Sequence, residues 1–357
     1  MKNQDYYLNN VNKNFLWKKL KYSLGKYKFN YENLRNSKIL ITGGTGYVGS
    51  WIVHALAAIN EREKLNIKIT LITAQKKNLN KYFYLNKKIK VNYIFSHISK
   101  IDKYTDKTFT HLIHAAAKYK ADSAEIYNTN IVGGKKIISL IKKNKIKNVI
   151  FISSGAVYEF KNRKEKPKEN FKKINLKNKN SYALSKYIVE KLFLKLAKKN
   201  KTNLTILRLF SFVGPGTSTL RHLAYTSIID AKCQNKNIKL ESDGNSYRSF
   251  MHSIDMVCWI IKSLFINKIN IINVGSNEEI KIIDMAKIIS KSRLLNLKKV
   301  KVIKHNNSEN NSYYVPNIAK ALKNKYYLFH NLNQAIKDDI KQRIIFKDPH
   351  RYYFNEE

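Results

Sequence analysis

Cysteines and long apolar runs are scarce in this sequence of 357 residues. Its two cysteines, Cys233 and Cys258, are too few for a disulfide framework or a zinc site built from cysteines. No segment reaches the ~18 uninterrupted apolar residues that a membrane helix needs, since Lys262 and Lys268 interrupt the most apolar stretch at 257–274. The first ten residues lack the apolar core of a secretory signal. We therefore expect a cytoplasmic protein with no metal and no membrane contact.

Acidic residues and arginine are also few. The chain has 25 Asp and Glu against 68 Lys and Arg, a formal net charge of +43, and nine of the basic residues are arginine. Arginine makes the best bidentate contacts with phosphates and bases, and a dedicated nucleic-acid-binding protein gathers its charge on one face. Here lysine is spread over the chain together with Asn and Ile, as A/T-rich codons would produce. We expect no nucleic-acid partner, and RNA binding is the alternative that the charge supports.

Short apolar runs alternate with helical segments from Lys38 onward. At about 150 residues per domain the length allows about two domains, and a 43% apolar share is ordinary for a globular protein. The alternation predicts an α/β fold with a doubly wound parallel sheet, and the irregular pattern after Phe210 predicts a smaller C-terminal α/β lobe. Strands are expected at 39–42, 67–73, 91–95, 111–114, 148–153 and 204–209, and helices at 15–24, 47–60, 126–144 and 182–199.

A glycine-rich loop follows the first expected strand. Gly43, Gly46 and Gly49 have the G-x-x-G-x-x-G spacing and lead into the helix that begins at Tyr47. Gly43 suits a tight turn, Gly46 lets the backbone approach a pyrophosphate, and Gly49 lets the helix pack on the strand, while the helix N-terminus faces the anion. This context predicts a dinucleotide site.

The end of the second strand bears on which dinucleotide binds. An acidic residue there would favour the ribose diol of NAD. Residues 73–77 read Thr-Ala-Gln-Lys-Lys, with no acid and two lysines. This favours NADP slightly, and NAD stays open because lysine is abundant throughout the chain.

Three further residues form a candidate catalytic set. Tyr182 and Lys186 are four residues apart at the start of an expected helix, so they lie on one face, and the ammonium would stabilise a phenolate. Ser154 follows an apolar strand, at the carboxyl edge where an open parallel sheet places its ligands.

Together these features resemble the extended short-chain dehydrogenase/reductases, specifically the NAD-dependent epimerase/dehydratase family that modifies nucleotide sugars. The resemblance runs from about Leu34 to Gln342 and implies a Rossmann-type sheet with a substrate-binding lobe. The motifs that carry it are Thr42–Gly49, His114–Ala117, Asn130–Gly133, Ser154, Tyr182, Lys186, Arg208–Pro215, Asp243–Phe250 with Asp255, and Asn273–Ser276.

The resemblance implies a role for each matched residue. Tyr182 would be the acid/base on a sugar hydroxyl, Lys186 would tune it and bond the nicotinamide ribose, and Ser154 would bond the reacting sugar oxygen. Arg248 would hold the substrate diphosphate, and Ser211 stands where many relatives have an asparagine that holds the nucleotide sugar. The cofactor contacts implied are Gly43, Thr45, Gly46, Tyr47, Val48, Gly49, Ala115, Ala116, Asn130 and Lys186.

Gly155 and Ala156 depart from the family's dehydratases, which carry acidic residues in this stretch. Eliminating water across C5–C6 needs an acid and a base beyond the tyrosine. The sequence therefore favours an NAD(P)-dependent 4-epimerase or 4-ketoreductase in surface-polysaccharide sugar biosynthesis. A 4,6-dehydratase or decarboxylase is the alternative within the family, and an NAD(P)-sensing regulatory protein is the alternative that is not an enzyme.

The expected organisation follows from these motifs. Residues 1–36 form an N-terminal extension, 37–210 the NAD(P)-binding Rossmann domain, 211–345 mainly the substrate lobe, and 346–357 a tail, with segments near 250–275 returning to the Rossmann domain. We expect a homodimer that binds a nucleotide-diphosphate sugar, and we interpret His252 and Asp255 as structural.

Overall fold

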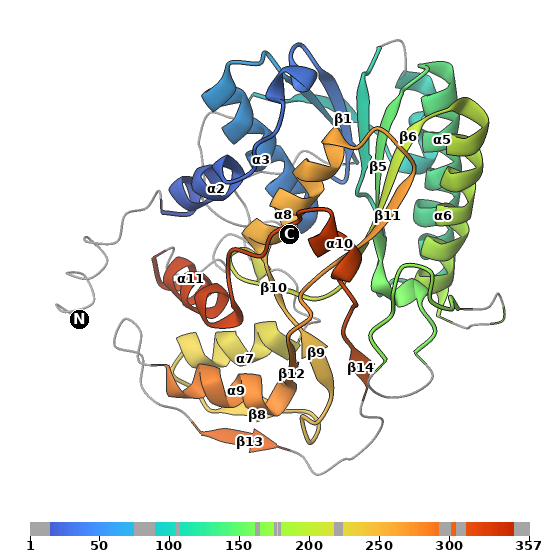
Figure 1. The fold of residues 1–357 in the computed structure, drawn as a ribbon. Coiled ribbons are helices and arrows are strands. Elements are labelled where there is room, and N and C mark those ends of the chain that lie inside the picture. Colours follow the sequence, from blue (N-terminus) through green and yellow to red (C-terminus); the bar gives the residue numbers. More distant parts are fainter. Residues whose placement is uncertain are drawn as a thin grey trace.

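The computed structural model describes residues 15–74, 90–104, 108–160, 165–174, 177, 180–217, 224–292, 301–304 and 312–345. Within these residues the centre is a parallel sheet of seven strands in the order β3–β2–β1–β4–β5–β6–β11, with helices on both faces (Figure 1). The strand order reverses between β1 and β4, which is the Rossmann-type topology, and the predicted fold class is confirmed. The strands are β1 (Lys38–Thr42), β2 (Lys68–Thr73), β3 (Asn92–Phe95), β4 (His111–His114), β5 (Asn148–Ser154), β6 (Asn203–Leu209) and β11 (Asn270–Val274).

The strands are apolar on both faces because helices cover both. In β1, Ile39 and Ile41 belong to the core on one side and Leu40 to the core on the other, as the two-residue period of a strand requires. Helices α3 (Tyr47–Glu63) and α8 (Ser253–Lys262) pack together on the first face, and α5 (Gly133–Lys143) and α6 (Ser181–Asn200) on the second (Figure 1). In the described part of the chain, no helix combines the length and apolar character needed to cross a membrane.

The predicted helix at 126–144 differs in detail. The structure has a short helix α4 (Ser123–Ile126), then a π-helical turn at Tyr127–Val132, and then α5. The wider turn contains Asn130, and its side chain forms hydrogen bonds with Lys118 and Ser185 inside the protein. Local π-helical turns of this kind often occur at functional sites.

The smaller lobe follows the sheet in the chain. Its helices α7 (Ala224–Cys233), α9 (Ile282–Lys291) and α11 (Leu332–Ile345) share an apolar core with strand β8 (Ile238–Leu240), which pairs with β13 (Val302–Lys304). A second small sheet joins β9 (Tyr247–Ser249) to β12 (Glu279–Lys281) and β14 (Tyr313–Tyr314), and β7 (Phe212–Val213) pairs with β10 (Met251–His252). The helix α10 (Ala319–Lys323) lies beside β11.

The chain therefore leaves the lobe and returns to the sheet, since β11 pairs in parallel with β6 along five positions. The proposed domain boundaries remain a prediction, and residues 1–14 and 346–357 lie outside the described residues.

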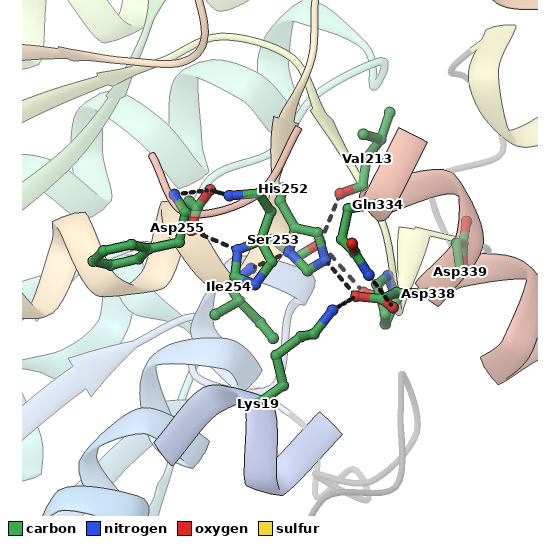
Figure 2. A network of polar contacts seen from close by, with 12 residues as sticks. Lys19, Val213, His252, Ser253, Ile254, Asp255, Gln334, Asp338 and Asp339 are labelled. Carbon is green, nitrogen blue, oxygen red and sulfur yellow. Dashed lines mark hydrogen bonds and ion pairs between the residues drawn. The ribbon is translucent and has the colours of Figure 1, made fainter. Parts of the chain in front are cut away.

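The N-terminal helix α2 (Phe15–Gly25) is attached to the body by apolar and polar contacts. Its residues Leu16, Leu20 and Leu24 are buried in the core that α3 and α8 share. At its polar side, Lys19 pairs with Asp338 of α11 (Figure 2). Helices from the two ends of the described chain thus meet at one seam.

His252 and Asp255 have structural roles at this seam, as the sequence suggested (Figure 2). The His252 Nδ1 atom accepts a hydrogen bond from the Ile254 amide at 2.9 Å and so caps α8, and its Nε2 atom lies 3.1 Å from Asp338. Asp255 accepts hydrogen bonds from the backbone amides of Phe329 and His330 at 3.1 and 3.0 Å. Both side chains are buried. They join the start of α8 to the backbone at 329–330 and to Asp338 of α11.

Candidate active site

The glycine loop begins where β1 ends and passes into α3. Gly43 has a φ of +67°, and a Cβ atom there would lie 2.7 Å from backbone atoms of Ala116, so glycine is required. At Gly49 a Cβ atom would lie 2.1 Å from the Gly43 carbonyl oxygen. At Gly46 it would meet that same oxygen at 3.2 Å, and no side chain caps the N-terminus of α3. The loop thus presents backbone and a helix N-terminus to the sheet's carboxyl edge.

Side chains around the loop hold β1 and β4 in register. Thr42 Oγ1 lies 2.6 Å from His114 Nδ1 and accepts a hydrogen bond from the Ala116 amide at 3.1 Å. His114 is buried, and burial lowers its pKa to about 3 with a smaller contribution from the charge of Lys186, so its ring is neutral. This arrangement positions Ala115 and Ala116, both half-buried, beside the glycine loop.

The candidate catalytic residues come from two elements that lie side by side. Ser154 ends β5, and Tyr182 and Lys186 lie one turn apart near the start of α6. The hydroxyl groups of Tyr182 and Ser154 interact, and the Lys186 ammonium lies 6.0 Å from the centre of the Tyr182 ring. The structure thus brings together the three residues that the sequence grouped.

Burial dominates the electrostatics of this set. It raises the pKa of Tyr182 to about 12, an effect that the Ser154 hydroxyl partly offsets. It lowers the pKa of Lys186 to about 7, and the nearby Glu190 carboxylate acts against that shift. The Lys186 Nζ atom donates a hydrogen bond to the Ile152 carbonyl at 2.8 Å. The tyrosine therefore needs a positive charge nearby to ionise near neutral pH.

Two further tyrosines border the set. The Tyr119 ring packs edge-on against Tyr182 with 4.9 Å between ring centres. The hydroxyl of Tyr314, in β14, interacts with Ser154, and burial raises the pKa of Tyr314 well above its usual value. Neither tyrosine belongs to the candidate catalytic set that the sequence predicted. Tyr119 follows the three alanines after β4, which places it at the carboxyl edge of the sheet. This position in the sequence could have identified it as a residue of the site.

The absence of a side chain at Gly155 has a structural cause. A Cβ atom there would lie 2.6 Å from the Phe210 ring and 2.7 Å from the Tyr314 hydroxyl oxygen. An acidic side chain at this position would displace both aromatic residues. Ser154 instead accepts a hydrogen bond from the Ala156 amide at 3.1 Å, which fixes the turn after β5.

The two predicted substrate residues lie at different depths. Arg248 in β9 is half-buried, bonds Ser312 through its guanidinium at 2.8 Å, and lies 6.0 Å from the centre of the Tyr314 ring. It is therefore linked through Tyr314 to Ser154. Ser211 is half-buried just before β7, and its carbonyl accepts a hydrogen bond from the Met251 amide at 3.1 Å.

Comparison with known proteins fits this geometry. A model of the NAD dependent epimerase/dehydratase family matches residues 39–275, a range that contains the glycine loop, Ser154, Tyr182, Lys186 and Arg248. The chain belongs to this family. The protein is thus an enzyme of the NAD-dependent type that modifies nucleotide sugars by epimerisation, dehydration or decarboxylation.

Individual relatives differ in the reaction they are named for. The chain is 26% identical over 329 residues to a UDP-glucose 4-epimerase of Pasteurella multocida (strain Pm70), covering 84% of this chain and 95% of the relative. It is 23% identical over 257 residues to UDP-glucuronic acid decarboxylase 3 of Arabidopsis thaliana, covering 71% and 74%. A UDP-N-acetylglucosamine 4-epimerase from Methanobrevibacter ruminantium M1, in complex with UDP-N-acetylmuramic acid, has the same fold with a TM-score of 0.74, 21% identity and coverage of 87% and 99%.

The glycine loop fits the family's dinucleotide cofactor mainly through its backbone, because several of its side chains contact other parts of the protein. The uncapped start of α3 and the bare backbone at Gly46 suit a pyrophosphate. The Tyr47 hydroxyl, however, contacts Ser253 of α8, so its side chain faces the core, and a contact of Tyr47 with the cofactor stays a prediction. Thr45 Oγ1 lies 3.3 Å from Thr73 Oγ1, and Val48 packs against the core.

Asn130 is engaged within the protein. Both its amide hydrogens are donated, to Ser185 Oγ at 2.9 Å and to the Lys118 carbonyl at 3.1 Å, and its oxygen accepts the Lys118 amide at 2.8 Å. It fastens the segment after β4 to α6, and its direct contact with a cofactor stays a prediction. Residues 75–77, on which the choice between NAD and NADP depended, lie outside the described residues.

Proposed function

We propose that the protein is a 4-epimerase or 4-ketoreductase of a nucleotide-diphosphate sugar, with Tyr182 as the acid/base. The observation that carries this proposal is the assembly of Ser154, Tyr182 and Lys186 at the sheet's carboxyl edge beside a turn that has no room for an acid at Gly155. A cofactor held by the glycine loop supplies hydride exchange at the sugar C4.

The residues of the chain supply the proton chemistry. Tyr182, as phenolate, accepts the proton of the C4 hydroxyl when that carbon is oxidised, and returns it on reduction. Ser154 holds the same sugar oxygen by a hydrogen bond. The Lys186 ammonium stabilises the phenolate by its charge. Arg248, always cationic and half-buried, is suited to the diphosphate through charge-assisted hydrogen bonds.

The relatives support a substrate of this class. The names of the epimerase and decarboxylase relatives contain UDP-sugars, and the phosphate-binding features of this chain suit a nucleoside diphosphate. The similarity to decarboxylases favours a second candidate, a decarboxylase or 4,6-dehydratase, which would need an acid from another part of the site. We also propose a homodimer, a cytoplasmic location and a role in making sugars for surface polysaccharides.

A panel of nucleotide sugars tests the function. The purified protein is incubated with each sugar, with and without added NADPH, and products are read by mass spectrometry and NMR. An epimerase gives a product of unchanged mass without added coenzyme, and a 4-ketoreductase consumes NADPH in step with product. Loss of 18 mass units (water) or 44 mass units (carbon dioxide) would replace the proposal by the second candidate. No turnover of any sugar would contradict the proposal.

A further inference from the structure

A buried ion pair lies one helical turn beyond Lys186. Glu190 follows Lys186 by four residues on α6, so the two side chains leave the same face of the helix. The Glu190 carboxylate receives the Arg208 guanidinium in a two-point contact, at 2.9 Å from Nε and 2.6 Å from Nη2. Both side chains are 2% exposed, so water does not screen this pair.

The same carboxylate reaches the strand that carries Ser154. Ser153 Oγ donates a hydrogen bond to Glu190 Oε1 at 2.6 Å. Ser153 is the neighbour of Ser154, and the Ile152 carbonyl just before it accepts the Lys186 ammonium at 2.8 Å. One carboxylate is thus tied to the helix that carries Tyr182 and Lys186 and to the strand end that carries Ser154.

Arg208 extends the contacts to the rest of the molecule. Its Nη1 atom donates to the Tyr158 hydroxyl and to the Glu169 carbonyl, both at 2.8 Å. Tyr158 in turn donates to Asn273 of β11 at 2.7 Å. Among the described residues, no buried polar atom of Glu190 or Arg208 is without a partner. A polar network that is fully satisfied holds its members in one geometry.

The charges that face this pair come from several elements. Lys186 is buried and has no carboxylate partner among the described ion pairs, so Glu190 is the anion that offsets the cost of its burial. The negative charge of Glu190 is balanced by the positive charge of Arg208, because the guanidinium does not lose its proton in a protein. Other titratable groups surround Lys186, Glu190 and Arg208. They are His114 on β4, Tyr158 after β5, Lys173 and Glu169 on the loop before α6, Tyr182 on α6, Tyr314 on β14 and Lys320 on α10.

We propose that Glu190 is a positioning residue of the active site, which keeps Lys186 cationic beside Tyr182 and fixes the end of β5 at Ser153. Arg208 sets how much of the carboxylate's charge acts on Lys186. This inference rests on the proposed function, because it concerns the residues that carry the proton step. It assigns a function to a buried pair that does not touch substrate or cofactor.

The test is the pH dependence of turnover in Glu190→Gln. The substitution keeps the shape and leaves the Arg208 cation without its anion, so both Lys186 and Tyr182 lose protons more easily. Both limbs of the pH profile of kcat/KM should move to lower pH, by about one unit, because a buried charge is poorly screened by water. A structural role alone would lower the rate or the stability without moving the limbs.

The double variant Glu190→Gln/Arg208→Met separates charge from shape. It removes both charges, and neutral replacement of a buried ion pair is often tolerated. The limbs of the pH profile of the double variant should return to within a few tenths of a pH unit of the wild-type positions. This measurement remains possible if the single variant does not fold. Limbs that stay fixed in Glu190→Gln, or that remain displaced in the double variant, would overturn the proposal.

A matched control is available in the smaller lobe. Asp339 and Arg343 form another buried ion pair, with 3.2 Å between Oδ1 and Nε. Asp339→Asn should lower the unfolding midpoint and leave the pH limbs in place. If the wild type turns over no nucleotide sugar, or if Tyr182→Phe is as active as wild type, the proposed function fails. If turnover depends on Tyr182 and the limbs of Glu190→Gln do not move, only the role of Glu190 fails.

Discussion

Tyr182 is a neutral phenol in the structure, because burial raises its pKa to about 12. If Tyr182 is the acid/base that we propose, proton transfer near neutral pH depends on positive charge placed around it. Lys186 supplies part of this charge, and its own pKa of about 7 means that it is readily lost. In the proposed mechanism the working pH range is therefore set by two coupled groups, Tyr182 and Lys186.

Tyr182→Phe tests the proton step. The substitution removes one oxygen and keeps nearly all the volume, so the fold and cofactor affinity should change little. Turnover should fall at least ~10²-fold, the lower bound for a general acid/base. Ser154→Ala should cost less, because it removes an orienting hydrogen bond and leaves the base. Steady-state kinetics on the substrate found in the panel measures both, and near-wild-type turnover of Tyr182→Phe would refute the assignment.

At the scale of an element, the loop between β1 and α3 combines two kinds of glycine. Gly49 is required by the fold, since a Cβ atom there would lie 2.1 Å from the Gly43 carbonyl oxygen. Gly46 is less constrained, with its nearest contact at 3.2 Å and an extended backbone that other residues adopt. Its glycine is better explained by a ligand that approaches the backbone closely.

The two glycines should therefore respond differently to substitution. Gly49→Ala should lower both the melting temperature and the affinity for the dinucleotide, because the loop must shift. Gly46→Val should lower the melting temperature less than Gly49→Ala does, because its Cβ atom would meet the Gly43 oxygen at 3.2 Å rather than 2.1 Å, and it should weaken binding at least ~10-fold, about 1.4 kcal/mol. Differential scanning fluorimetry and calorimetric titration with NAD and NADP measure the two effects. Wild-type affinity in Gly46→Val would mean that the pyrophosphate does not lie at this position.

Helix α2 should contribute to stability through its apolar face. Leu20 is fully buried against α3 and α8, and its truncation would leave a cavity. Leu20→Ala should cost about 2–5 kcal/mol of unfolding free energy. Tyr22 on the same helix is 64% exposed, so Tyr22→Ala should change that free energy by less than ~0.5 kcal/mol. Equal urea midpoints for the two variants would show that α2 does not stabilise the body.

At the scale of the whole molecule, the pH dependence of stability should come from three of the buried histidines in the described part of the chain. Burial lowers the pKa of His111 to about 4 and of His114 to about 3, and it lowers that of His252 as well. In the unfolded chain each imidazole takes up a proton near pH 6.5. The unfolded state therefore binds more protons than the folded state below that pH, and stability falls as pH falls.

We expect the unfolding free energy to decrease between pH 7.5 and 5, by on the order of 2 kcal/mol each for His111 and His114 and in the same direction for His252. Urea denaturation across this range measures the slope. His111→Gln removes one of the titrating groups and should flatten it. A midpoint that does not change between pH 7.5 and 5 would contradict the expected loss. The pKa of Asp338 is lowered in the folded state. Its contribution to stability is therefore lost only as the pH falls through the ordinary titration range of an aspartate and below it.

The sequence by itself determined most of the sheet, the glycine loop and the candidate catalytic set. Apolar runs buried on both faces specify parallel strands, and the glycines, Ser154, Tyr182 and Lys186 follow local rules of turn and helix spacing. Local pattern also predicted six of the seven strands of the central sheet within one residue at each end, and it did not predict β11. These features depend on neighbours in the chain, so they can be inferred from it.

Only the tertiary structure decided which distant residues join the site. Tyr119 packs on Tyr182, Tyr314 contacts Ser154, and Arg248 lies beside the Tyr314 ring. These residues come from three separate segments, and no local period in the sequence predicts that they meet. Packing also turned Tyr47 toward Ser253 and filled the space at Gly155 with the Phe210 ring and the Tyr314 hydroxyl. The Glu190–Arg208 pair also could not be predicted from the sequence. Its electrostatic effect on neighbouring groups depends on burial, and only the fold removes the two charges from water.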